Sequence, residues 1–205
     1  MFWSLLSKLE DEDTGEILLK ELKTEIPDYR IEESKNLVSI LGNEVVEEFP
    51  WANGMKPSTN DNVEGVLRRT WRPALSIVGS DGMPSTANAG NVLRPYTTLQ
   101  LSMRIPPMVD PKKAVDAIEK ILKDDIPYGA SVELEFEEAA EGWNAPESKP
   151  WLLDAIEKAS KKYFNQMPCT IGEGGTIPFM AMLGKQFPEA QFVITGVLGP
   201  QSNAH

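Results

Sequence analysis

Hydrophobic and polar positions alternate with a period of two in parts of this sequence. In residues 96–104, one face of the chain carries Thr97, Leu99, Leu101 and Met103. The opposite face carries the polar residues Thr98, Gln100, Ser102 and Arg104. This period is that of a β-strand with one buried face, and Arg104 falls at the end of the polar face. Residues 131–137 alternate in the same way, and the apolar run 73–80 between Pro and Gly also predicts a strand.

Apolar residues spaced three or four apart predict helices in other parts of the chain. The expected helices are 1–9, 32–41, 43–48, 110–123, 150–164 and 177–187. The segment 110–123 has the clearest start, because Asp110 can cap the helix and Pro111 suits its first turn. The stretch "FPWANGMKPSTNDN" (49–62) predicts a long loop from its Gly, Pro and Asn content.

The order of these elements predicts two modules of different architecture. Residues 71–138 read strand, strand, helix, strand, which is an antiparallel sheet backed by a helix. After the linker "EEAAEGWNAPESKP" (137–150), helices alternate with short strands near 169–171 and at 191–195, which favours part of a parallel α/β sheet. The expected fold class is therefore α/β with α+β, with a boundary near residue 140.

Composition limits the functions that are open to the chain. With 205 residues it can bury a sizeable core, and 41% hydrophobic and 25% charged residues are ordinary for a globular protein. A net charge of −11 argues against a nucleic-acid or acidic-membrane partner. A single cysteine excludes an intrachain disulfide, and no apolar run approaches the length that spans a bilayer. The start lacks a signal-peptide pattern, so we expect a cytoplasmic protein.

Three groups of residues are candidates for binding or chemistry. The turn "GEGGTIP" (172–178) has Gly174, Gly175 and Thr176 before a helix, where free amides can receive a carboxylate or phosphate; an ordinary glycine turn with a Thr cap is the alternative. Arg104 is shaped to bind a carboxylate with two hydrogen bonds, with Asn91 before the same strand, although both residues also suit an exposed surface. His205 is the only histidine and by itself makes neither a metal site nor a triad.

Taken in order, four stretches resemble the carnosinase-type members of the di-zinc metallopeptidase family. They are "WRPALSIVGSDG", "AGNVLRPYTTLQLSMRIPP", "GEGGTIP" and "GVLGPQSNAH", and the start "WSLLSKLEDEDTGEI" resembles the family's first lid helix. The family also includes carboxypeptidase G, acetylornithine deacetylase and succinyl-diaminopimelate desuccinylase. The resemblance implies a ferredoxin-like lid (dimerisation) domain in residues 1–139, with its first strand missing and a long insertion at 16–70, followed by a partial α/β zinc-peptidase catalytic domain in residues 140–205.

The resemblance also assigns roles to the candidate residues. Arg104 matches the lid arginine that binds the substrate carboxylate, and Asn91 falls where the family has an Asn or Thr in contact with substrate. Gly174, Gly175 and Thr176 match the turn that receives the C-terminal carboxylate, and His205 matches the last zinc ligand. Gly172 stands where the carnosinase-like branch usually has an arginine.

Several parts of the family's machinery are absent from this sequence. The His-x-Asp and Glu-Glu motifs and the lid histidine that completes a neighbouring subunit's site are missing, so no complete catalytic set is expected. We therefore expect a fragment of a zinc-dependent dipeptidase that binds two zinc ions in the parent, is inactive alone, and dimerises through the lid. The alternatives are a non-catalytic dimerisation or carboxylate-binding module, or an amidohydrolase of the deacetylase or desuccinylase type acting on N-acyl amino acids. Without the first lid strand, strands 96–104 and 131–137 are expected to expose unpaired edges or to pair with each other.

Overall fold

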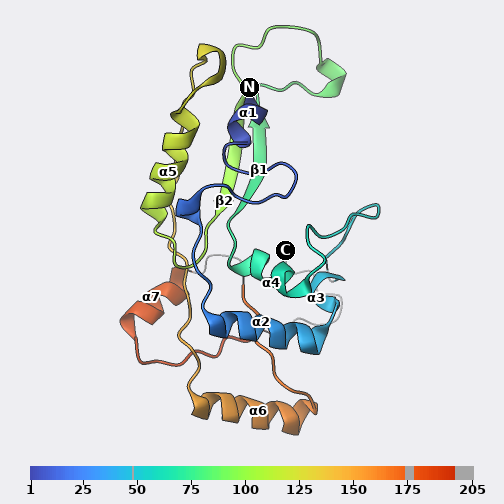
Figure 1. Ribbon diagram of the computed structural model, residues 1–205, viewed down its shortest axis with the longest axis vertical. Coiled ribbons are helices and arrows are strands. Elements are labelled where there is room, and N and C mark those ends of the chain that lie inside the picture. The colour runs from blue at the N-terminus through green and yellow to red at the C-terminus, as the bar shows by residue number, and fades with distance from the viewer. Residues whose placement is uncertain (48, 174–177, 197–205) are drawn as a thin grey trace.

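The structure is a computed structural model that describes residues 1–47, 49–173 and 178–196, and Figure 1 shows its arrangement. Its elements in chain order are α1 (Phe2–Leu6), η1 (Lys20–Leu22), α2 (Asp28–Leu41), α3 (Glu44–Glu47), α4 (Asn62–Thr70), β1 (Ala74–Asp81), η2 (Thr86–Asn88), β2 (Thr98–Arg104), α5 (Pro111–Lys123), η3 (Pro127–Gly129), α6 (Pro150–Phe164) and α7 (Pro178–Gln186). It is a mixed helix and sheet fold, and its sheet has two strands within the described residues. No helix in the described parts of the chain is long and apolar enough to cross a membrane.

The sheet is an antiparallel hairpin of β1 and β2. Ala74 is the partner of Arg104 at one end and Asp81 is the partner of Thr98 at the other, with a bulge between Ile77 and Gly79. Polar residues of β2 lie on one exposed face, while Leu99, Leu101 and Met103 are half-buried on the other. The strand pattern in residues 96–104 is therefore confirmed, including the outward position of Arg104.

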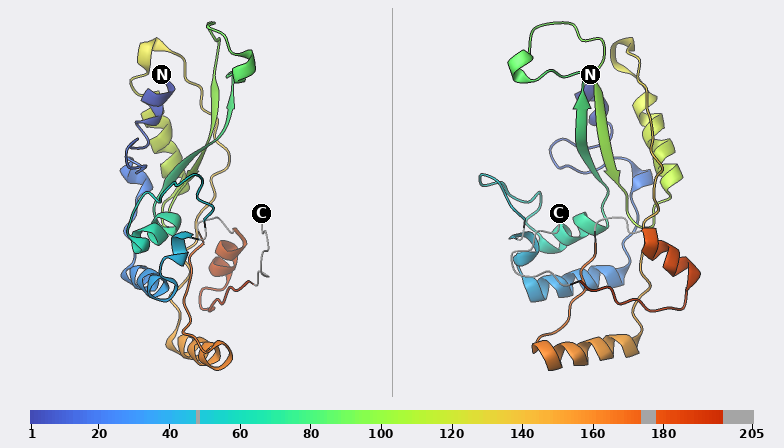
Figure 2. Two further views of the ribbon diagram at one scale, coloured as in Figure 1. Left: turned by 90° about the vertical axis from the view of Figure 1, so that its right-hand side faces the viewer. Right: turned by 180° about the vertical axis from the view of Figure 1, so that it is seen from behind.

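The main core lies on the apolar face of this hairpin. Its buried members are Leu5, Leu9, Ile17, Leu19, Leu22, Val109, Ala114 and Leu122. The helices α1 and α5 cover the same face of the sheet, as the left view of Figure 2 shows. Asp110 caps α5 by accepting hydrogen bonds from the backbone amides of Lys112 and Lys113, at 2.9 and 3.3 Å. The expected cap and the helix 110–123 are thus confirmed.

A second, smaller cluster joins α2, α3 and α4 below the hairpin. Leu37, Val45 and Val66 are its buried members. The helix α4 was not expected, since we predicted a loop up to residue 62 and no helix after it. Its start is nevertheless encoded, because the Asp61 carboxylate accepts from the amides of Val63 and Glu64 at 2.9 and 3.3 Å.

The helices α6 and α7 form the least buried part of the chain. Leu152 is the single buried residue of α6, and α7 has none. A side-chain node ties the segment before α6 to α2: the Arg30 guanidinium donates to Asn144 Oδ1 at 3.1 Å and to the Ala145 carbonyl at 2.6 Å. In Figure 1, α6 lies at the foot of the molecule, beneath α2.

Three expected strands are wrong. Residues 131–137 are not a strand, and neither 169–171 nor 191–195 forms one within the described residues. In residues 131–137 the alternating pattern still predicts which side chains are buried, since Val132 and Leu134 are half-buried against the main core. A strand also needs a hydrogen-bonded neighbour, which an alternating pattern cannot supply. The suggestion that 96–104 and 131–137 pair with each other is not realised either.

Candidate functional site

Arg104 is the best-placed binding residue in the described part of the chain. It ends β2, because Pro106 and Pro107 follow within three residues and a proline has no amide to continue the ladder. The side chain is exposed, and no hydrogen bond or ion pair holds its guanidinium within the described residues. Its cross-strand partner is the small Ala74, which leaves space beside the guanidinium. This arrangement leaves the planar donor face free for an anionic ligand.

The base of the hairpin near Arg104 is fixed by a second arginine. Arg72 binds the Glu64 carboxylate with two hydrogen bonds, from Nε to Oε1 at 3.1 Å and from a terminal nitrogen to Oε2 at 3.2 Å. This pair joins α4 to the residues that lead into β1. Because both oxygens of Glu64 accept from Arg72, the Arg72 guanidinium is already paired with a carboxylate. The Arg104 guanidinium has no such partner within the described residues.

Asn91 lies in the exposed loop that connects the two strands. The loop closes at Gly82, which has φ +74°, and a Cβ added there would lie 2.5 Å from the Tyr96 carbonyl oxygen. Glycine is therefore required for the two ends of the loop to approach. The loop exposes apolar side chains beside Asn91, since Val92 is 70% and Leu93 100% accessible to solvent.

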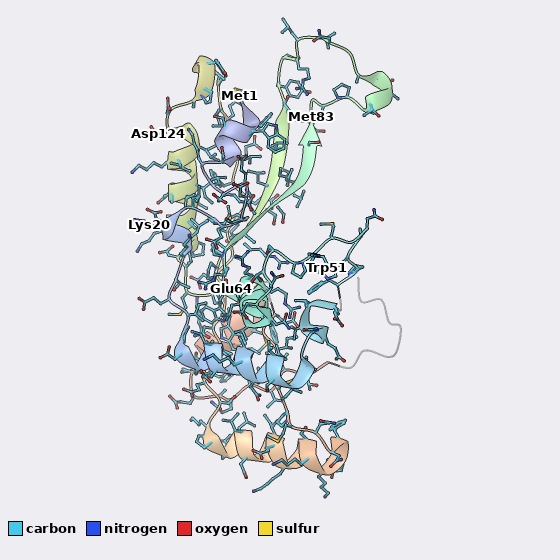
Figure 3. The ribbon with its side chains drawn as sticks, turned by 45° about the vertical axis from the view of Figure 1, so that its right-hand side comes forward. Met1, Lys20, Trp51, Glu64, Met83 and Asp124 are labelled. Carbon is cyan, nitrogen blue, oxygen red and sulfur yellow. The ribbon has the colours of Figure 1, made fainter. Side chains whose placement is uncertain are left out.

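The structure does not bring Asn91 and Arg104 together. They lie at opposite ends of β2, which has seven residues and therefore spans about 20 Å. In Figure 3, Met83 marks the loop end of the hairpin and Glu64 marks the end near Arg104. A dipeptide extends only about 7 Å, so one such molecule cannot reach both side chains in this conformation.

The remaining predicted site residues lie outside the described residues. These are Gly174, Gly175 and Thr176 in the turn, and His205. The chain on either side of the turn is described. Before it, a Cβ on Gly172 would lie 2.8 Å from Thr70 Cγ2 of α4. After it, a Cβ on Gly184 of α7 would lie 2.6 Å from Trp143 Nε1.

These two close approaches assign positioning roles that the sequence reasoning missed. Thr70 and Trp143 each meet a glycine in a segment that flanks the turn, so a larger residue at either glycine would displace its segment. Trp143 also packs edge-on against Phe192, with ring centroids 5.2 Å apart. The signal in the sequence was the pair of glycines, Gly172 and Gly184, on either side of the glycine turn.

No group of three or more His, Cys, Asp or Glu side chains capable of holding a metal ion occurs in residues 1–47, 49–173 or 178–196. The single cysteine, Cys169, is an exposed residue, although its thiol is partly buried. Partial burial of its thiol raises the pKa above the ordinary value, which disfavours the thiolate that would act as ligand or nucleophile.

No family model matches the sequence. Among curated proteins, the chain is 27% identical over 134 residues to the cysteinylglycine-S-conjugate dipeptidase of Corynebacterium striatum, an alignment that covers 65% of this chain and 29% of that protein. It is 30% identical over 142 residues to the Cys-Gly metallodipeptidase DUG1 of Saccharomyces cerevisiae, with 65% of this chain and 28% of that protein covered. The chain therefore spans less than a third of the length of the curated relatives it matches.

Three solved peptidase structures share the fold of this chain. Human carnosine dipeptidase 1 superposes with a TM-score of 0.64 at 19% identity, covering 90% of this chain and 39% of that one. An M20 family metallo-carboxypeptidase from Sulfolobus solfataricus superposes with a TM-score of 0.71 at 16% identity, covering 93% and 42%. The dipeptidase Dug1p from Saccharomyces cerevisiae gives 0.66 at 21% identity, covering 91% and 39%.

Proposed function

We infer the function of this chain from its similarity to two Cys-Gly dipeptidases, to carnosine dipeptidase 1 and to an M20 family metallo-carboxypeptidase. We propose that it supplies the carboxylate-binding part of a zinc-dependent dipeptidase. In this role it holds the free C-terminal carboxylate of a small peptide, and the hydrolytic groups come from polypeptide beyond this chain. The observation that carries the proposal is the exposed guanidinium of Arg104 at the end of β2, which no hydrogen bond or ion pair engages in the described part of the chain.

The chemistry of Arg104 suits this role. A guanidinium presents paired donors that match the two oxygens of a carboxylate. Gly174, Gly175 and Thr176 are proposed to offer backbone amides to the same carboxylate, and Asn91 to contact the substrate through its amide.

The residues of this chain do not fit a complete di-zinc centre. The sequence has one histidine and one cysteine, and its described residues contain no cluster of three metal-ligating side chains. A catalytic zinc needs three protein ligands and a bound water. We therefore propose His205 as one ligand of a site that other residues must complete, and we derive no reaction step through the metal.

A homodimer is the proposed assembly. Asn91 and Arg104 are separated by the length of β2, which is about 20 Å, so one copy cannot place both on one dipeptide. Two copies that exchange hairpin loops would supply the two groups to the same substrate. The proposed division, with a lid in residues 1–139 and a partial catalytic domain in 140–205, puts the hairpin in the part expected to dimerise.

The direct test is dipeptide binding by the purified chain. We expect Cys-Gly to bind, and Arg104→Ala to weaken its binding by about 10- to 100-fold, because a charged hydrogen-bonded pair is lost. Lys112→Ala is the control, since it removes one exposed positive charge from α5 and should leave the affinity unchanged. Equal affinities for the Arg104→Ala variant and the parent chain would overturn the proposal.

Hydrolysis separates the proposal from its alternatives. We expect no turnover of Cys-Gly by this chain with zinc alone, because the general base and most ligands are missing. A carboxylate-binding module without any catalytic partner remains the second candidate, favoured by the single histidine. The peptidase names of the relatives favour small peptides over the N-acyl amino acids of the deacetylase type.

A further inference from the structure

The loop between α3 and α4 contains an Asn-Gly pair in an exposed turn. The Met55 amide donates to the Ala52 carbonyl at 3.0 Å, which closes a four-residue turn around Asn53 and Gly54. Both central residues have a positive φ, +50° at Asn53 and +79° at Gly54, as in a type I′ turn. Residues 51–56 are all exposed, and this loop projects away from the helices in Figure 1. The pair is therefore open to water.

The groups that could react with each other in this turn are not held by other contacts. Within the described residues, neither the Asn53 side-chain amide nor the Gly54 backbone amide makes a hydrogen bond. A Cβ built on Gly54 would meet no atom within 4 Å, so the space beside the turn is empty. Neither hydrogen bonds nor packing therefore restrain the peptide unit that joins the two residues.

Rotation of this one peptide unit converts the turn from type I′ to type II′ while its two ends stay in place. The ψ angle of the first central residue changes from about +30° to about −120°, and φ of the second changes sign. Glycine adopts both signs of φ, so residue 54 accepts either geometry. In the type II′ geometry the Gly54 nitrogen faces the side-chain carbonyl carbon, Cγ, of Asn53.

We propose that Asn53 is a site of spontaneous deamidation. The Gly54 nitrogen gives up its proton to solvent and attacks Asn53 Cγ, which forms a new N–C bond and a five-membered succinimide ring. The bond from Cγ to Nδ2 breaks, and Nδ2 takes up a proton and leaves as ammonia. Water then adds to one ring carbonyl and opens the ring. Opening at Cγ gives aspartate, and opening at the backbone carbonyl carbon gives isoaspartate.

Both products change the surface of the protein. Each adds one negative charge to a chain with a formal net charge of −11. Isoaspartate also lengthens the main chain by one methylene group, which disrupts the closing bond between Met55 and Ala52. None of the residues proposed to bind substrate lies in this loop, so the modification is independent of the proposed function.

A second asparagine provides an internal comparison. Asn165, which follows α6, is exposed and has φ +54°, close to the value at Asn53. It is followed by Gln166 instead of glycine. A side chain on the attacking residue crowds its nitrogen and restricts its φ, so the same reaction is slower at Asn165.

The experiment follows the purified chain during incubation at neutral pH and physiological temperature. Deamidation raises the mass of the affected peptide by about one dalton, which peptide mapping by mass spectrometry measures. We expect Asn53 to react at least about tenfold faster than Asn165. The rate should rise with pH, because the attacking nitrogen must lose its proton. Isoaspartate is counted by methyl transfer from S-adenosylmethionine with an isoaspartyl methyltransferase.

Two matched variants and one peptide make the test specific. Asn53→Gln should remove most of the isoaspartate, because its carbonyl carbon is too far along the side chain to close a five-membered ring, whereas Asn165→Gln should leave the yield unchanged. A synthetic peptide of residues 50–57 gives the rate without the fold, and the chain should react within about tenfold of it. No reaction at Asn53, equal rates at Asn53 and Asn165, an undiminished yield in Asn53→Gln, or a chain that reacts far more slowly than the peptide would overturn the proposal.

Discussion

The hairpin region and the C-terminal helices have similar apolar patterns but very different burial. The core beside β1 and β2 contains eight buried residues drawn from α1, the segment between α1 and η1, η1, the connection between β2 and α5, and α5. By contrast α6 buries Leu152 alone and α7 buries no residue. Large apolar side chains of these two helices remain more than half exposed, including Trp151, Leu153, Tyr163, Phe164, Phe179 and Met182.

The difference teaches that an apolar stripe on a helix becomes a core only when a second surface faces it. The helix α5 faces the sheet, while α6 lies at the foot of the molecule away from it (Figure 1), so an apolar helix face is buried in one place and exposed in the other. Exposed apolar surface of this extent is typical of faces that other polypeptide covers.

The largest expected effect comes from truncating a leucine on each side of this comparison. Leu9 has 0% exposure and Leu153 has 52%, so Leu9→Ala should lower the free energy of unfolding by about 2–5 kcal/mol and Leu153→Ala by about 0.5 kcal/mol or less. Urea denaturation of the two variants measures both. Similar losses in the two variants would mean that α6 is packed as tightly as the hairpin core.

An intermediate effect is expected at the helix caps. Asp110 accepts two backbone amides at the start of α5, whereas Lys149 at the start of α6 gives no side-chain cap. Asp110→Ala should therefore cost about 1 kcal/mol, while Lys149→Ala should cost almost nothing and Lys149→Ser should protect the first turn of α6. Hydrogen exchange of the amides in the two first turns provides the measurement, and slower exchange in α6 after Lys149→Ala would contradict this view.

The smallest effect concerns an exposed turn of the hairpin region. The Thr14 hydroxyl donates to the Asp11 carboxylate at 2.7 Å and holds the pKa of that carboxyl below its ordinary value. A lowered folded-state pKa gives a stabilisation that is present at neutral pH and is lost as the pH falls through the folded pKa, in the range below about 4. Thr14→Val should move the pKa of Asp11 upward, which carbon-detected NMR titration would show; an unchanged titration would refute the role of the hydroxyl.

Local patterns predicted those parts of the fold that local interactions decide. The cap at Asp110, the alternation in β2 and the outward position of Arg104 each depend on a few neighbouring residues. The helix α4 was missed because the Gly, Pro and Asn residues before it dominated the interpretation of that stretch. Residues 131–137 were misjudged because a strand depends on a hydrogen-bonded neighbour that lies far away in the sequence.

The candidate site was predictable by residue type and only partly by geometry. Arg104 could be placed on the polar face of a strand from its position alone, but its separation from Asn91 depends on how the hairpin loop projects. The close approaches of Gly172 to Thr70 and of Gly184 to Trp143 join segments far apart in the chain. Such contacts leave no periodic signal in a sequence.

The contact between Lys8 and the end of α5 has a consequence for synthesis of the protein. The Lys8 ammonium donates to the carbonyls of Asp124 and Asp125, which follow it by 116 and 117 residues. During synthesis, residues 5–22 leave the ribosome before these acceptors are made, so their core side chains stay exposed to water until α5 has been synthesised. A chaperone that holds nascent chains would therefore meet the apolar side chains of this segment, such as Leu5, Leu9 and Ile17, during that interval.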